Sequence, residues 1–133
     1  MVKEIIVTTK SRAQMVDITG LIWDVVTKSG VIAGICYVYI PHTTAGVTIN
    51  ENADPSVVSD ILNETAKMVP WNDNYRHAEG NSAAHIKASM MGFSQVILID
   101  AGRLILGTWQ GIYFCEFDGP RTRKVLVKIL KEE

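Results

Sequence analysis

The chain contains few of the features that mark secreted, redox-active or membrane proteins. It has only two cysteines, Cys36 and Cys115, which lie in separate apolar runs and form no CxxC pair. Neither a cysteine-rich zinc site nor a redox pair is therefore expected, and we expect two buried, reduced thiols. The longest apolar stretches, such as residues 96–99, are far too short to span a bilayer.

Neither sign of charge is in excess. Thirteen lysines and arginines stand against fourteen aspartates and glutamates, which gives a formal net charge of −1. This balance argues against a broad basic face for nucleic acid, although it leaves room for a local anion pocket. The first ten residues alternate as in a strand and lack the basic start and apolar run of a signal peptide. We therefore expect a cytoplasmic protein with no membrane or nucleic-acid partner.

The pattern of expected helices and strands indicates an α+β fold. No linker, repeat or low-complexity tract divides the 133 residues, so residues 1–133 are interpreted as a single domain. Apolar periodicity predicts helices at residues 19–29, 54–68 and 81–91. Period-2 and β-branched runs predict strands at residues 3–9, 31–40, 47–50, 95–100, 104–106, 112–117 and 124–131. Because strands dominate the last forty residues, an α+β fold is favoured over a doubly wound parallel sheet.

All three histidines lie between positions 42 and 85, in polar or glycine-rich surroundings. His42 ends a strand, His77 belongs to a loop, and His85 lies at the start of a short helix, so the three could converge. Three neutral imidazoles with an open fourth position are the arrangement of catalytic zinc sites. The spacing is not a recognised zinc signature, and a histidine in a turn or on a half-buried helix face is the alternative at each position.

Carboxylates lie close to the histidines along the chain. Glu51 and Asp54 follow the His42 loop, and Glu79 is two residues from His77. Any of the three could accept the second ring N–H of a metal-bound histidine. Glu79 could instead act as a general acid or base, and Asp54 is most simply a helix cap.

A second polar cluster lies near the C-terminus. Arg121 and Arg123 share one face if they lie on a strand, where they could bind a phosphate or carboxylate bidentately. The alternative is a surface pair that balances nearby Glu116 and Asp118. Trp109 is expected at an exposed turn, where it would suit a planar ligand or a subunit contact.

Four segments carry motifs that are similar to those of one protein family. They are residues 42–55 (HTTAGVTINENADP), 77–81 (HAEGN), 85–87 (HIK) and 106–121, which begins LGTWQGIY and ends FDGPR. On these motifs the chain closely resembles the YjbQ-like family, also called secondary thiamine-phosphate synthase enzymes, over essentially its whole length. The resemblance implies a two-sheet β-sandwich of mostly antiparallel strands with two to three helices. It also implies a homotrimer with sites near subunit boundaries.

The resemblance assigns residues to that site. It implies a divalent metal, zinc first, held by His42, His77 and His85. Catalytic roles fall to Glu51, Glu79 and Arg121, and substrate-binding roles to Thr43, Asn81, Lys87, Trp109 and Gln110.

The activity that the resemblance implies is the joining of a pyrimidine pyrophosphate to a thiazole phosphate. Loss of pyrophosphate in that reaction requires anion neutralisation, which the metal, Arg121 and either Arg123 or Lys87 could provide. Two other functions stay open at this point. One is metal-assisted hydrolysis of a small phosphorylated metabolite. The other is a non-catalytic trimer that binds a small anion or metabolite.

Overall fold

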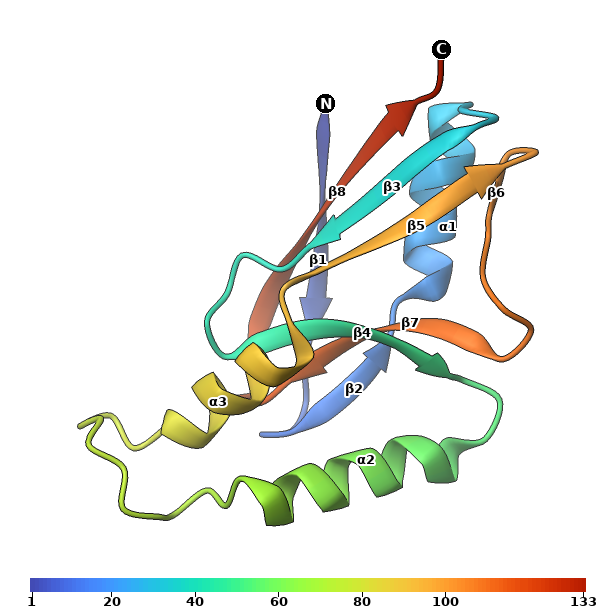
Figure 1. Cartoon of the computed structure of the whole chain (residues 1–133). Helices are drawn as coiled ribbons and strands as arrows, with labels where there is room; N and C mark the ends of the chain where they lie inside the picture. Colours follow the sequence, from blue (N-terminus) through green and yellow to red (C-terminus); the bar gives the residue numbers. More distant parts are fainter.

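Two antiparallel sheets and three helices make up the fold. The structure is a computed structural model that describes all of residues 1–133 (Figure 1). One sheet has five strands in the order β1-β8-β3-β5-β6, and the other has three in the order β2-β7-β4. The strands are β1 (Val2–Thr8), β2 (Gln14–Asp17), β3 (Gly34–Tyr39), β4 (Ala45–Glu51), β5 (Ser94–Asp100), β6 (Arg103–Leu104), β7 (Gln110–Glu116) and β8 (Thr122–Lys131). The helices are α1 (Thr19–Ser29), α2 (Pro55–Met68) and α3 (Ser82–Met91). The expected α+β sandwich is confirmed.

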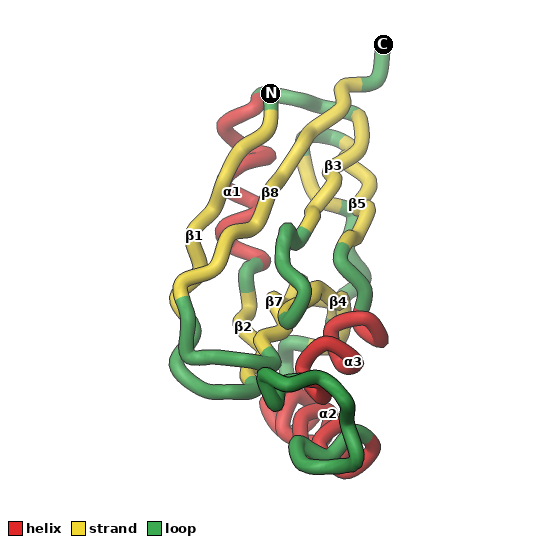
Figure 2. Tube along the Cα trace, turned by 90° about the vertical axis from the view of Figure 1, so that its left-hand side faces the viewer, coloured by secondary structure: helices red, strands yellow, loops and turns green.

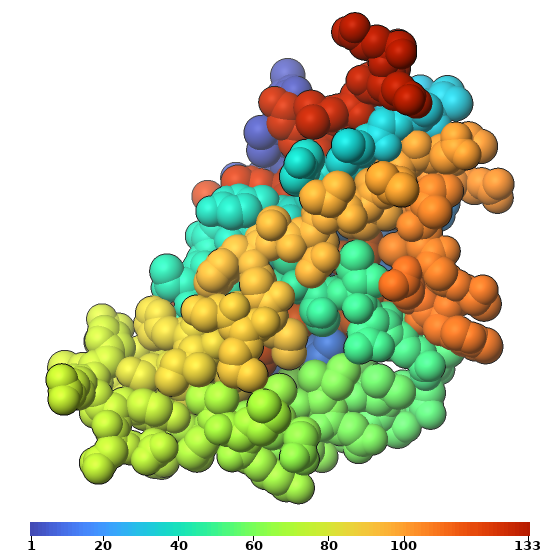
Figure 3. All heavy atoms as spheres, in the orientation of Figure 1, coloured from blue at the N-terminus to red at the C-terminus, as the bar shows by residue number.

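The three-stranded sheet is covered on both faces, which explains the apolar run of β7. Ile112 and Phe114 on one face belong to the main core, together with the inner face of the larger sheet and the buried stripe of α1. Tyr113 and Cys115 on the other face pack against α2 and α3. Figure 1 shows the two helices below and beside β4 and β7, and Figure 3 shows them covering that end of the molecule. Strands buried on both faces are apolar without alternation.

The larger sheet, by contrast, has one open face. Cys36 and Val38 of β3 point into the core, whereas Tyr37 and Tyr39 between and after them are exposed. Strands β1, β8, β3 and β5 lie side by side in Figure 2, with α1 on one side only. Their outward side chains are therefore left uncovered in a single chain.

Local signals fix the helix boundaries close to the expected positions. The Asp54 carboxylate accepts the Ser56 N–H at 2.9 Å and caps α2, and Pro55 opens its first turn. Gly30 ends α1 in the left-handed conformation at φ 70°. Strand β2 was not predicted; its four residues pair with β7 and are too short for a clear period-2 pattern. No helix is long and apolar enough to cross a membrane.

Candidate functional site

A polar pocket of about 430 Å³ lies where the three histidine-bearing segments meet. Apart from Pro41, every residue of its lining is polar or charged, in contrast to most small-molecule pockets. The lining residues are Pro41, His42, Thr43, Thr44, His77, Glu79, Asn81, His85, Asp118, Arg121 and Arg123. Such a lining favours a ligand that is itself highly polar or charged.

Separate elements deliver the three imidazoles to this pocket. His42 lies in the loop between β3 and β4, His77 in the loop before α3, and His85 near the start of α3. The Val47 N–H on β4 donates to the Gly92 carbonyl at 3.0 Å, just beyond α3, and so ties that helix to the sheet. The position of the His85 ring therefore depends on the docking of α3 against β4.

His77 and His85 are neighbours in the pocket. Their ring centroids are 5.4 Å apart and the rings meet edge to face, at 89°. The Oε2 atom of Glu79 lies 4.0 Å from Nε2 of His77. The two rings and the carboxylate thus form one cluster of possible ligands and proton carriers, in which His77 and Glu79 are exposed and His85 is half-buried.

His42 is held differently. Its Nε2 accepts the backbone N–H of Lys124 at 2.9 Å, so in the neutral ring the proton is on Nδ1. Desolvation, followed by the positive charge of Arg123, lowers the pKa of His42 below its ordinary value. The ring is therefore neutral near pH 7, which is the form that binds metals.

Arg123 and Glu116 form a buried ion pair at the base of the pocket. Arg123 donates from Nε to Oε1 at 2.8 Å and from Nη2 to Oε2 at 2.5 Å, and Nη2 also reaches Thr44 Oγ1 at 2.8 Å. Both side chains are at most 5% exposed. Since β7 and β8 belong to different sheets, this pair links the two sheets at the edge of the pocket.

A second pair lies at the rim. Arg121 donates from Nη2 to Asp118 Oδ2 at 2.9 Å, and the same oxygen accepts the Asn81 amide at 2.9 Å. Asn81 Oδ1 is buried and is the one buried side-chain nitrogen or oxygen without a hydrogen-bond partner in the protein. An unpaired buried acceptor of this kind can be satisfied by a donor from a ligand or water.

The structure gathers part of the expected site in one chain. Seven of the predicted residues line the pocket: His42, Thr43, His77, Glu79, Asn81, His85 and Arg121. Glu51 and Gln110 do not, because they pair at one end of β4 and β7 while Ala45 and Glu116 pair at the other. Six residues of strand separate the two ends by about 20 Å. Trp109, 62% exposed, lies at that far end as well.

Lys87 is also outside the pocket of its own chain. It is 6% exposed on the inner side of α3, with Nζ 5.2 Å from the centroid of the Phe117 ring. Desolvation, followed by the charge of Arg12, lowers the pKa of Lys87. Its side chain packs behind the pocket rather than into it.

Three polar residues of the site were not assigned to it from the sequence: Thr44, Asp118 and Glu116. Arg123 was considered only as a possible anion ligand. A signal for it exists, because Arg123 shares the period-2 face of β8 with buried Val125 and Val127. A charged residue on a buried face requires a buried partner.

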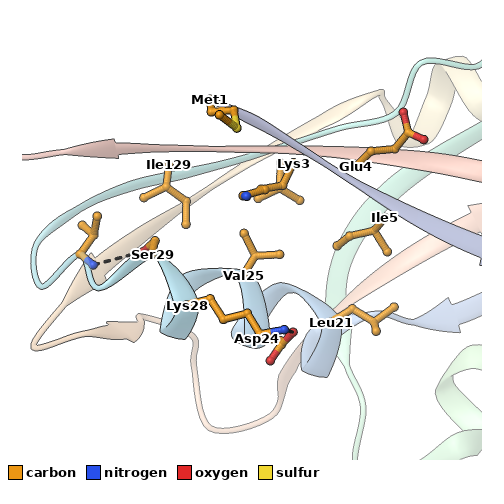
Figure 4. A pocket seen from close by; sticks show the side chains of 12 residues that line it. Met1, Lys3, Glu4, Ile5, Leu21, Asp24, Val25, Lys28, Ser29 and Ile129 are labelled. Atoms are coloured by element: carbon orange, nitrogen blue, oxygen red, sulfur yellow. Dashed lines mark hydrogen bonds and ion pairs between the residues drawn. The ribbon is translucent and has the colours of Figure 1, made fainter.

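A larger groove of about 520 Å³ lies elsewhere, between α1 and the strands β1 and β8 (Figure 4). Aliphatic side chains, among them Ile5, Leu21 and Ile129, line it together with the ends of Lys3 and Lys28. It contains no histidine. The histidines, which could bind a metal or transfer a proton, thus all lie at the smaller, polar pocket.

Comparison with other proteins identifies relatives along the whole chain. Residues 3–132 match the family model described as UPF0047 protein YjbQ-like. The UPF0047 protein MJ1081 of Methanocaldococcus jannaschii is 54% identical over 127 residues, covering 96% of this chain and 92% of its own. The UPF0047 protein YugU of Bacillus subtilis is 50% identical, covering 98% and 99%.

Solved structures agree with these matches. A crystal structure of a YjbQ/UPF0047 protein from Clostridium acetobutylicum has a TM-score of 0.95 and 58% identity, covering 96% of this chain and 99% of its own. The hypothetical protein APE1520 of Aeropyrum pernix K1 also has a TM-score of 0.95, at 37% identity, covering 99% of each chain. The names of these proteins state a family or a locus and no reaction.

Proposed function

The chain belongs to the UPF0047 YjbQ-like family, and we propose that it is a metal-dependent enzyme acting on a small phosphorylated metabolite. The observation that carries the proposal is that three histidines from three separate segments line one pocket, which is polar apart from Pro41. His42, His77 and His85 would hold a divalent ion, zinc first. Glu79 would serve as general acid or base, and the arginines would meet the phosphate.

The charges of the pocket support a metal. Its two arginines face three carboxylates, two in the lining and one directly behind it: Glu79, Asp118 and Glu116. Among these arginines and carboxylates, two positive and three negative charges leave one negative charge, which does not attract a phosphate. A divalent cation reverses the sign, and a bound cation is often the largest local charge in such a site.

The side chains fit an ion after a limited rearrangement. Two imidazoles on one tetrahedral zinc ion have centroids about 5 Å apart, given Zn–N bonds of about 2 Å. The 5.4 Å between His77 and His85 agrees with this value. No three His, Cys, Asp or Glu side chains are already grouped as ligands, and Nε2 of His42 accepts the Lys124 N–H. Ligation by His42 therefore requires its ring to turn.

Each group then has a chemical task. A bound ion supplies Lewis acidity and neutralises phosphate oxygens. Glu79 is exposed beside His77 and can exchange a proton with a reacting group. Asn81 Oδ1, which lacks a partner, can accept a hydrogen bond from a hydroxyl or amine of the metabolite. Thr43 lies at the exposed edge and can orient the ligand.

The proposed assembly is a homotrimer in which neighbouring copies complete the site. Glu51, Trp109 and Gln110 can reach a pocket only from another copy, because each lies at the far end of β4 and β7 in its own chain. The uncovered face of the larger sheet, with exposed Tyr37 and Leu98, supports self-association. Light scattering should give three times the chain mass of 14.7 kDa. A monomer at micromolar concentration would contradict the trimer.

Elemental analysis combined with an activity panel tests the proposal. Wild type is expected to carry one zinc or other divalent ion per chain, and His85→Ala to lose it. Met90→Ala, an exposed change on the same helix, is the matched control and should retain the ion. If wild type still contained no bound metal after incubation with excess zinc, the proposed metal site would be contradicted.

Activity assays on the metal-bound protein identify which reaction it catalyses. Thiamine-phosphate synthesis from its two precursors is the first reaction to test, since the sequence motifs imply it. Release of inorganic phosphate from simple phosphate esters, with no coupling of the precursors, would favour a hydrolase. Thermal stabilisation by phosphate compounds without turnover of any would favour a binding protein.

A further inference from the structure

We propose that Arg123 is the residue that grips the phosphoryl group, and that Glu116 is a positioning residue that holds its guanidinium in place. The inference rests on the proposed function, because it names the group in the same pocket that meets the anion. The sequence offers Arg123 only as an alternative anion ligand beside Arg121 and Lys87, and it gives Glu116 no role in the site. The geometry favours the buried arginine over the exposed one.

The guanidinium of Arg123 is fixed before any ligand arrives. Nε donates to one oxygen of Glu116, and both N–H groups of Nη2 are used, one on Glu116 and one on Thr44. The side chain is 5% exposed. A donor held in this way loses little conformational entropy on binding, which is the advantage of a preorganised site.

One side of this guanidinium is still free. No protein group accepts a hydrogen bond from Nη1. Nη1 is not a buried, unsatisfied atom either, since Asn81 Oδ1 is the only atom of that kind. Arg123 lines the polar pocket, and from this we infer that Nη1 is the part of the guanidinium that faces that space. Its two N–H groups are therefore the unused donors at the base of the pocket, and phosphoryl oxygens are suitable acceptors.

Glu116 is itself locked in position. Besides Arg123, its carboxylate accepts the Thr9 hydroxyl at 2.8 Å and the backbone N–H groups of Phe117 and Asp118, each at 3.1 Å. It is completely buried. The carboxylate therefore cannot turn away, and the orientation of Arg123 follows from it.

Arg121 offers weaker recognition. Its side chain is 52% exposed and is bound to Asp118 at the rim, where water competes for its donors. Ion pairs and anion contacts at such exposed positions contribute little. We expect Arg121 to assist at the entrance, whereas Arg123 fixes the place of the phosphoryl group.

Calorimetric titration of the zinc-loaded protein with inorganic pyrophosphate tests the assignment. Arg123→Lys keeps the charge but cannot reproduce the planar fork, so Kd should rise about tenfold or more. Arg121→Lys should raise Kd by less than about threefold, because an exposed contact contributes little. Lys28→Gln, an exposed change on α1 outside the polar pocket, is the control and should bind like wild type.

For Glu116→Gln, the two explanations predict opposite changes in the Kd for pyrophosphate. The substitution removes a negative charge behind the pocket, so the change in charge alone would tighten the binding of an anion. If Glu116 positions Arg123, Kd should instead rise about three- to tenfold, from the loss of one charged hydrogen bond. Thr44→Val removes the third acceptor of Arg123 without changing charge and should weaken binding in the same direction.

The outcomes separate this inference from the proposed function. Each variant is titrated well below its own Tm, so a purely stabilising role would lower Tm and leave Kd unchanged. If Arg123→Lys bound pyrophosphate with the same Kd as wild type, the role of Arg123 would be overturned, and the proposed function would stand. Tighter binding by Glu116→Gln would overturn its positioning role. Zinc-loaded wild type that binds no pyrophosphate would overturn the proposed function together with the inference.

Discussion

Replacing Glu116 by glutamine exchanges one oxygen for an amide nitrogen at the centre of the buried network beneath the pocket. The carboxylate accepts five hydrogen bonds, two at Oε1 and three at Oε2. The glutamine amide is expected to keep its oxygen at the Oε2 position, because three of the five donors point there. Its NH2 group then faces Arg123 Nε and the Thr9 hydroxyl. The hydroxyl can still donate to the Arg121 carbonyl, 3.1 Å away, so the Arg123 bond is the main loss.

The expected cost follows from these contacts. Removing one member of a buried ion pair costs about 3–5 kcal/mol, because the other charge stays buried without compensation. A chain of 133 residues has an unfolding entropy near 0.28 kcal/mol per kelvin, at about 2.1 cal/mol/K per residue. The Tm of Glu116→Gln should therefore fall by about 10–18 °C.

Thermal unfolding by circular dichroism measures this, with Glu4→Gln as the matched control. Glu4 pairs with Lys124 at 3.8 Å on the surface, where both side chains are about half exposed. Such a pair contributes at most about 1 kcal/mol, so the Tm of the control should fall by less than about 4 °C. Equal Tm values for the two variants would refute the claim that the buried pair stabilises the junction of the sheets.

Three further predictions follow. Burial tends to raise the pKa of Glu116, but its hydrogen bonds outweigh this and hold the pKa below the ordinary value of 4.5. The contribution of ionised Glu116 to folding stability is therefore complete above pH 4.5 and is lost as pH falls through the pKa of the folded state. The difference in Tm between wild type and Glu116→Gln should therefore become smaller in acid. Gly46→Ala would set a Cβ 2.5 Å from the Gly92 carbonyl, displace α3, and lower zinc affinity measured by chelator competition. Burial raises the pKa of Cys36 to about 11 and of Cys115 to about 12, so both thiols should react with Ellman's reagent only after unfolding.

Local signals in the sequence were sufficient for most of the fold. The helix ends lie within a residue or two of the signals at Asp54-Pro55, Gly30 and Gly92, because capping is a short-range effect. The strand Gln14–Asp17 escaped prediction because only its pairing with β7 defines it. Pairing partners more than ninety residues apart leave no local pattern.

The site was predictable in part for a similar reason. The histidines lie in polar stretches that apolar periodicity does not explain, so they could be identified as candidates. Thr44 could not, since it acts through the side chain of Arg123, which lies 79 residues further along the chain. Glu116 could be identified only as a surface partner of the arginines, because its burial depends on how the two sheets pack. Glu51 and Trp109 show the converse limit, because the motifs assign them to the site whereas the fold holds them at the far end of β4 and β7. Sequence motifs do not say whether such residues approach the pocket from a second copy, as proposed above.

The affinity for inorganic pyrophosphate with and without zinc tests the central claim most directly. The claim is that the histidine pocket binds phosphorylated ligands through a divalent ion, because its own charges leave it slightly negative. Calorimetry on wild type should show binding to the zinc-loaded protein and at least about tenfold weaker binding after removal of the metal, equivalent to about 1.4 kcal/mol. The same affinity in both states, with the fold intact by circular dichroism, would contradict the account.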